Sequence, residues 1–140
     1  MAQQGQSGLA PEADGELAKY RVIQEEVQKL KGTQQELMQQ HHENEMLKEE
    51  LNLLNPNDKV FKKIGPVMMR HDLSEGKETV NKRMEHITAA IAALEKQIAE
   101  KSNKGNEIAG KIQQIQREMQ EKAQREAKAI AANQGQEQEV

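Results

Sequence analysis

The chain has 140 residues, of which 35% are hydrophobic and 31% charged, and Tyr20 and Phe61 are its only aromatic residues. This composition argues against a self-sufficient globular core and is typical of long amphipathic helices. The formal net charge is -3 with both signs interspersed, which argues against a nucleic-acid-binding surface.

The absence of cysteine excludes disulfides, thiolate zinc sites and thiol catalysis. The first residues lack the basic and apolar regions of a secretory signal, and no run of 18 apolar residues occurs. We therefore expect a cytoplasmic protein that is neither secreted nor membrane-spanning.

Residues 1–14 are rich in Gln, Gly and Ser and are expected to form a disordered N-terminal tail. A helix is predicted over residues 15–54, because its apolar positions alternate steps of three and four, the spacing of a coiled-coil seam. The seam changes phase before Leu47, and Asn55-Pro56 ends the helix. The expected seam positions of this helix are Tyr20, Ile23, Val27, Leu30, Gln34, Leu37, His41 and Asn44, then Leu47, Leu51 and Leu54.

Residues 59–72 differ in character, because β-branched, aromatic and methionine residues flank Gly65-Pro66. A β-hairpin is predicted here, with Gly65 supplying a positive φ at the first position of a type II′ turn and Pro66 following it.

A second helix is predicted over residues 75–130, with Asp72 or Ser74 as its N-terminal cap, and residues 131–140 are expected to form a disordered tail. The seam spacing continues through this helix without a phase change. Its expected positions are Val80, Met84, Ile87, Ile91, Leu94, Ile98, Lys101, Gly105, Ile108, Ile112, Ile115 and Met119.

The predicted fold is mainly α: an antiparallel two-helix coiled coil with one β-hairpin at the connection. A lone two-stranded hairpin is marginal in water and leaves both strand edges unpaired. We therefore expect it to pair with equivalent hairpins of neighbouring subunits and to close a larger sheet or β-barrel in an oligomer. The expected assembly residues are Val60, Phe61, Ile64, Gly65, Pro66, Val67, Met68 and Met69.

The run ENEMLKEELNLLNPNDKVFKKIGPVMMRHDLSEGKETVNKRMEHITAAI, residues 43–91, resembles the core of β-type subunits of the prefoldin family. The likeness includes the end of the first helix, the VFK-x-x-GPV hairpin and the ETVNKRMEHIT segment. It implies a hetero-oligomeric hexamer of two α-type and four β-type subunits whose hairpins build a double β-barrel. It also implies an ATP-independent chaperone that captures unfolded actin and tubulin and passes them to the cytosolic ring chaperonin.

If the chain folds back near Gly65, Tyr20 is expected opposite Gly110, and Leu30 opposite Glu100. Unless residues 1–14 are helical, residues beyond about 115 would then have no partner helix. Met119, Ala123, Ala127 and Ile130 would present apolar surface there. Glycines at positions 32, 105 and 110 each cost roughly 1 kcal/mol of helix relative to alanine, so this end of the coil should fray.

Fraying would expose flexible aliphatic and methionine surface suited to contact with many unfolded chains. Each of these residues is also explained as an ordinary seam residue, and a seam that opens serves both purposes. The expected client-binding residues are Tyr20, Ile23, Ile108, Ile112, Ile115 and Met119.

No catalytic, metal or cofactor site is predicted. The run from His42 to Met46 lacks the second histidine of a zinc-protease helix, and neither type of glycine-rich nucleotide loop is present. A coiled-coil scaffold or tether without chaperone activity is the alternative function. A leucine-zipper transcription factor is disfavoured because no basic region precedes either heptad run.

Overall fold

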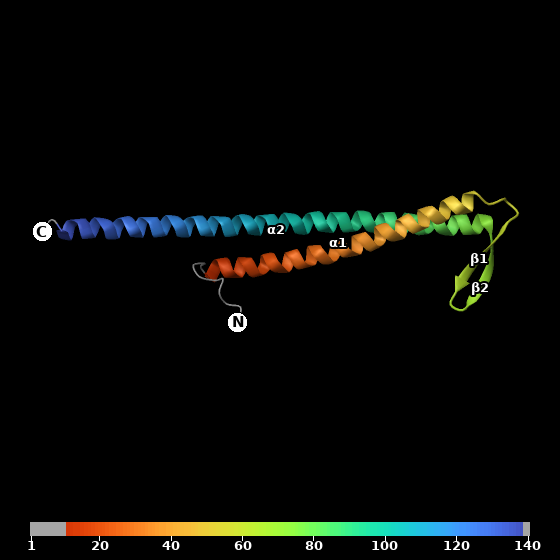
Figure 1. The fold of residues 1–140 in the computed structure, drawn as a ribbon, viewed down its shortest axis with the longest axis horizontal. Coiled ribbons are helices and arrows are strands. Elements are labelled where there is room, and N and C mark those ends of the chain that lie inside the picture. Colours follow the sequence, from red (N-terminus) through yellow and green to blue (C-terminus); the bar gives the residue numbers. More distant parts are fainter. Residues whose placement is uncertain (1–10, 139–140) are drawn as a thin grey trace. The chain divides into compact units, whose positions relative to one another are not determined.

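The computed structural model describes residues 11–138, which form two long helices separated by one hairpin (Figure 1). The elements in chain order are α1 (Pro11–Asn52), β1 (Lys59–Ile64), β2 (Val67–Asp72) and α2 (Leu73–Gln138). This arrangement confirms the predicted fold class.

The chain divides into two compact units, and both helices pass through both of them. The hairpin unit comprises residues 28–99 and contains both strands. The terminal unit comprises residues 11–27 and 100–138 of the described part of the chain.

The helices extend further than expected into the predicted tails. Residues 11–14 belong to α1 and residues 131–138 to α2, whereas residues 1–10 and 139–140 lie outside the described part. Pro11 suits the first position of a helix, where its missing amide proton leaves no hydrogen bond unmade. Alanine, glutamine and glutamate beyond residue 130 are strong helix formers, and no proline interrupts them.

The connection from α1 to β1 is a compact turn rather than more helix. The amides of Leu53 and Leu54 donate to the carbonyls of Glu50 and Leu51, at 3.1 and 3.3 Å, which tightens the last turn. The backbone N–H of Asn55 donates a hydrogen bond to Asp58 Oδ2 at 2.8 Å. The backbone N–H of Asp58 donates one to the backbone carbonyl of Asn55 at 2.9 Å. The predicted helix end at residue 54 is therefore two residues late.

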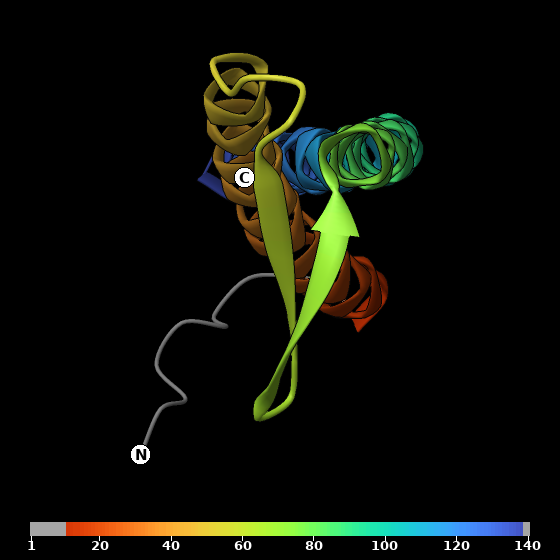
Figure 2. The same ribbon diagram turned by 90° about the vertical axis from the view of Figure 1, so that its right-hand side faces the viewer.

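The two strands form an antiparallel twisted ribbon (Figure 2), with Ile64 paired to Val67 next to the turn and Lys59 paired to Asp72 at the base. Gly65 has φ +58°, the only positive φ among the described residues. Proline cannot adopt positive φ, so Gly65-Pro66 form the predicted type II′ turn rather than type I′.

A small apolar cluster lies in the hairpin unit where the hairpin joins the helices. Leu51, Leu73 and Val80 are buried there, and Val60 and Met84 pack against them. Because Gly76 has no side chain, Val60 can approach α2 closely: a Cβ on Gly76 would lie 3.1 Å from Val60 Cγ2. This cluster fixes the base of the hairpin to both helices.

The predicted seam is confirmed by burial in each unit. All of its expected positions are buried or half-buried except Leu47 and Leu54, which are each 38% exposed and lie beyond the phase change. In the terminal unit the seam includes an ion pair, with Lys101 Nζ 2.7 Å from Glu26 Oε2.

The expected register is wrong by more than one helical turn. A Cβ on Gly105 would lie 3.4 Å from Ile23 Cγ2 and 3.8 Å from Tyr20 Cε2, so Tyr20 lies opposite Gly105 and not Gly110. The cause is an asymmetric connection: α2 begins directly after β2, whereas α1 ends at Asn52, well before β1. The midpoint between paired helical residues therefore lies before Gly65 in the sequence.

Candidate functional site

The hairpin has two faces of different character. Successive side chains of a strand point to opposite faces, so the observed pairing divides the hairpin residues into two sets. The face that carries Val60 is partly covered at its base, where Val60, Lys62 and His71 are half-buried. It comprises Val60, Lys62, Ile64, Val67, Met69 and His71, and the opposite face comprises Lys59, Phe61, Lys63, Met68, Arg70 and Asp72.

Both long edges of the hairpin carry backbone groups that the hairpin itself does not use. The two-residue turn makes Ile64–Val67 a hydrogen-bonded pair, and such pairs alternate with non-bonded pairs along the ladder. In the non-bonded pairs Phe61–Arg70 and Lys63–Met68, amides and carbonyls point outward. In the part of the chain that the structure describes, the sheet has two strands only, so no further strand covers these edges.

The predicted assembly residues form an exposed apolar surface on this hairpin. Phe61 and Met68 are each 60% exposed, and Val67 is 56% exposed. Ile64 and Met69 are also exposed, as are the turn residues between the strands. Val60 differs from the rest of the set, because it packs on the apolar cluster and anchors the hairpin.

The predicted client-binding residues lie in the seam of the terminal unit. Tyr20 and Ile23 lie close to Gly105, and the other four residues of the set are half-buried along α2. The set is therefore not an open apolar patch in the folded chain. Separation of the two helices would expose more of its surface.

Residues 120–135 of α2 have no covered side chains. All of the residues from 120 to 135 are exposed, including Ala123, Ala127 and Ile130, and Met119 is the last half-buried one. Ile130 is 58% exposed. This agrees with the expected overhang, although α1 begins earlier than predicted.

The structure brings together residues that the sequence analysis did not select. Leu53 in the turn before β1 is 84% exposed. Because it lies outside the seam spacing, the sequence could have predicted that this leucine is exposed. Lys62 and Lys63 of β1 line a groove together with Arg83 of α2. The adjacent lysines in a predicted strand were visible in the sequence, but their proximity to Arg83 was not.

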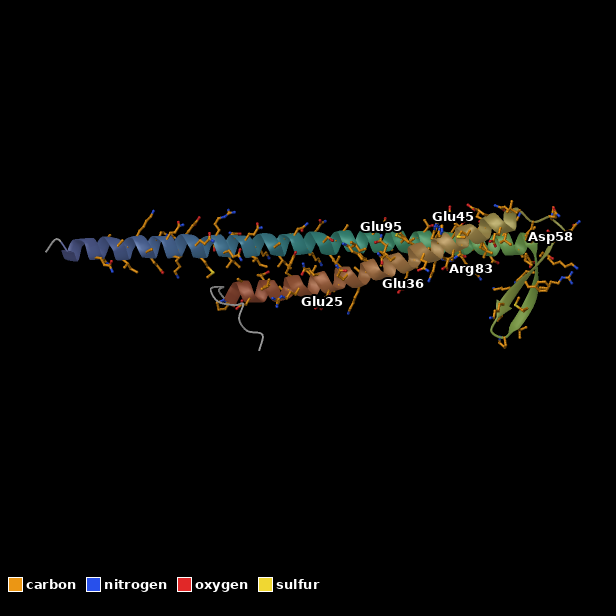
Figure 3. The ribbon with its side chains drawn as sticks, viewed as in Figure 1. Glu25, Glu36, Glu45, Asp58, Arg83 and Glu95 are labelled. Carbon is orange, nitrogen blue, oxygen red and sulfur yellow. The ribbon has the colours of Figure 1, made fainter. Side chains whose placement is uncertain are left out.

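The exterior of the helices is strongly charged. Glu25, Glu36, Glu45 and Glu95 are all exposed (Figure 3). Within residues 11–138 there is no cluster of three histidine, aspartate or glutamate side chains that could hold a metal ion. No described helix has a stretch both long and apolar enough to cross a membrane.

Comparisons with known proteins identify relatives over most of the chain. A family model described as "Prefoldin subunit" matches residues 15–126. Prefoldin subunit 6 of Mus musculus is 37% identical over 106 residues, covering 76% of this chain and 84% of that protein. The probable prefoldin subunit 6 of Caenorhabditis elegans is 34% identical over 114 residues, covering 81% of this chain and 90% of that protein.

A solved structure shares the fold. The crystal structure of the prefoldin beta subunit from Thermococcus strain KS-1 superposes with a TM-score of 0.74 at 19% sequence identity. The match covers 78% of this chain and 96% of that one. Both the helices and the hairpin connection are thus arrangements already seen in a crystal.

Proposed function

This chain belongs to the prefoldin family and is a chaperone subunit, as its resemblance to β-type subunits predicted, and we propose that its hairpin joins those of other prefoldin subunits in a heterohexamer. The proposed neighbours are α-type and further β-type subunits, whose strands together close the β-barrel. The assembly residues are those that the sequence predicted, with Val60 anchoring the hairpin from within its own chain.

The observation that carries this proposal is the hairpin's unpaired edges beside exposed apolar side chains. Phe61 and Met68 lie on one face, and backbone groups of both strands point outward beside them. Isolated two-stranded hairpins are marginal in water, and free edges of this kind invite pairing with other strands. Added strands would satisfy the backbone groups and cover the apolar side chains together.

We propose that the terminal unit captures clients through its seam. The six predicted residues are aliphatic, aromatic or methionine side chains, and the unit's helices are held by half-buried contacts rather than by a large core. Opening this seam would present an adaptable apolar surface, and such surfaces suit promiscuous binding. The clients are unfolded chains of the actin and tubulin class, which pass to the cytosolic chaperonin.

The proposed activity is binding without catalysis or ATP hydrolysis, in the cytoplasm. Membership of a family of chaperone subunits supports this, as does a sequence without nucleotide-binding loops. Neither nucleic acid nor a membrane is a proposed partner.

Assembly is tested by co-expressing the chain with α-type and β-type prefoldin subunits and weighing the complexes by native mass spectrometry. Met68→Asp should remove the chain from the hexamer, because it places a charge in the surface that neighbouring strands would cover. Met46→Asp is the matched control: Met46 is 50% exposed on α1, against 60% for Met68. A hexamer that retains the Met68→Asp chain at the wild-type level would contradict the proposal.

Client capture is tested in the assembled hexamer with Ile108→Ser/Ile112→Ser. We expect the hexamer to persist while suppression of actin or tubulin aggregation falls, because the apolar surface for clients is reduced. Val22→Ser, at a 53% exposed position outside the seam, should leave suppression unchanged. Equal suppression by all three proteins would refute the assignment of these residues.

A further inference from the structure

A groove beside β1 in the hairpin unit has an apolar floor. It has a volume of roughly 320 Å³ and is formed by β1, by His71 of β2 and by parts of both helices. Leu47 and Leu51 of α1 and Val80 of α2 contribute its apolar lining. Leu51 and Val80 belong to the buried cluster, so the groove has a firm base.

The charged residues at this groove are all basic. Lys62, Lys63 and Arg83 line it, and no aspartate or glutamate does. Arg83 lies on α2 close to the hairpin (Figure 3). His71 also lines the groove, and its Nδ1 is 3.1 Å from Glu75 Oε2.

These three cations have no acidic partner within the described chain. The ion pairs among residues 11–138 that involve lysine join Lys19 to Glu16, Lys82 to Glu78 and Lys101 to Glu26. None of them involves Lys62, Lys63 or Arg83. Lys62 is half-buried, but its unpaired ammonium is not, so the charge stays within reach of solvent or of a partner's carboxylate.

The strand edge next to the groove has the same sign of charge. β1 carries Lys59, Lys62 and Lys63 and no acidic residue, whereas β2 balances Arg70 with Asp72. The amides and carbonyls of Phe61 and Lys63 point outward at the β1 edge, as the pairing pattern requires. A second copy of β1 docked on this edge would bring lysines together, which disfavours pairing of identical chains there.

We propose that the β1 edge and its groove bind an acidic strand of a different prefoldin subunit, in which carboxylates flank an apolar side chain. The backbone edge pairs with the strand, the apolar side chain enters the groove, and the carboxylates meet Lys62, Lys63 and Arg83. This inference rests on the proposed assembly function and adds to it a rule for choosing the neighbour. Charge complementarity at interfaces of this kind selects partners and excludes wrong ones.

The first test uses Lys62→Glu/Lys63→Glu/Arg83→Glu in the full chain, co-expressed with the other prefoldin subunits. We expect at least about a tenfold loss of this chain from the hexamer, because like charges would then face each other. Lys31→Glu/Lys48→Glu/Lys96→Glu is the control: it makes the same change in net charge at three exposed positions of the hairpin unit. Lys62→Arg/Lys63→Arg/Arg83→Lys should assemble like the wild type.

The outcomes separate the two proposals. Failure of the wild-type chain to enter any hetero-oligomer would refute the assembly function itself. The groove variant is Lys62→Glu/Lys63→Glu/Arg83→Glu. If it entered the hexamer in the same amount as the wild type, only the acidic-strand inference would be overturned. Loss of the groove variant and the control alike would also overturn it, because net charge rather than the groove would then control assembly.

The second test identifies the occupant directly. A carbodiimide joins a lysine amine to a carboxylate in contact with it, so treating the wild-type hexamer should link Lys62 or Lys63 to an aspartate or glutamate in a strand of another subunit. Mass spectrometry of the digested product locates the link. Links to a second copy of this chain, to a client, or to no neighbouring strand would each contradict the inference.

Discussion

The hairpin unit and the terminal unit join the same two helices by different means. In the hairpin unit, Leu51, Leu73 and Val80 form a buried apolar cluster that also holds Val60 of the hairpin. In the terminal unit, the seam contains an ion pair and a glycine, with Lys101 next to Glu26 and Gly105 next to Ile23. Exposed ion pairs stabilise proteins less than buried aliphatic side chains do, so we expect the terminal unit to open more easily.

This difference matches the two roles proposed for the units. Assembly requires a hairpin held in a fixed position, because its strand edges must match those of other subunits. Client capture requires helices that separate at modest cost, because the apolar side chains are half-covered when the coil is closed. Local opening free energies vary within one protein, and hydrogen exchange measures them amide by amide.

The largest effect is expected for Leu51→Ala, which removes a buried side chain from the cluster. It should lower the stability of the hairpin unit by about 2–4 kcal/mol, through lost burial and the cavity left behind. Leu53→Ala, two residues away at an 84% exposed position, should change stability by less than about 0.5 kcal/mol. Urea denaturation followed by circular dichroism measures both. Similar losses for the two variants would show that the cluster does not stabilise this unit.

A smaller effect is expected for Gly76→Val, which places methyl groups against Val60. The Cβ alone would lie 3.1 Å from Val60 Cγ2, so the side chain must push the hairpin base away from α2. We expect a cost of about 1–3 kcal/mol, typical of overpacking. Hydrogen exchange of the β1 and β2 amides locates the change. Unchanged protection of the strand amides would mean that close approach at Gly76 does not position the hairpin.

Lys101→Leu tests the terminal unit by replacing a seam lysine with an apolar side chain. The ion pair with Glu26 is partly exposed and is expected to contribute less than about 1 kcal/mol, so added burial should outweigh its loss. We expect the α2 amides near residue 101 to exchange more slowly and client capture to weaken. Faster exchange would show that the ion pair stabilises the unit more than apolar burial can.

The smallest effect is expected for Gly110→Ala. No atom lies within 4 Å of the added Cβ, so the substitution should stabilise the helix by up to about 1 kcal/mol without a clash. Gly15→Ala, which lies in α1 and also has free space around it, is the control for a general gain in helix stability. If slower exchange in α2 left client capture unchanged, opening of the seam would not be the step that controls capture.

Much of the fold follows from local sequence. The alternating steps of three and four residues located the seam from Tyr20 to Asn44 and from Val80 to Met119. Gly65-Pro66 determined the turn, because glycine alone readily adopts positive φ and proline cannot, so that Ile64 pairs with Val67. The run from residue 43 to residue 91 was sufficient to indicate the family.

Sites formed by several elements were not predictable in this way. The seam spacing indicates which side of each helix is covered, but not which turn of the partner covers it, so Tyr20 was assigned to the wrong glycine. The apolar floor and basic rim of the groove come from β1, α1 and α2 together, and no local pattern joins Lys62 to Arg83.

The sequence by itself determined the seam, the hairpin turn and the family, because each depends on residues close together in the chain. Only the tertiary structure decided the register of the coil, the contact between Val60 and Gly76, and the gathering of three cations beside one strand edge. The physical reason is that the turn after α1 has no counterpart before α2. That asymmetry sets which residues of α1 lie opposite which residues of α2, and it depends on how the whole connection packs.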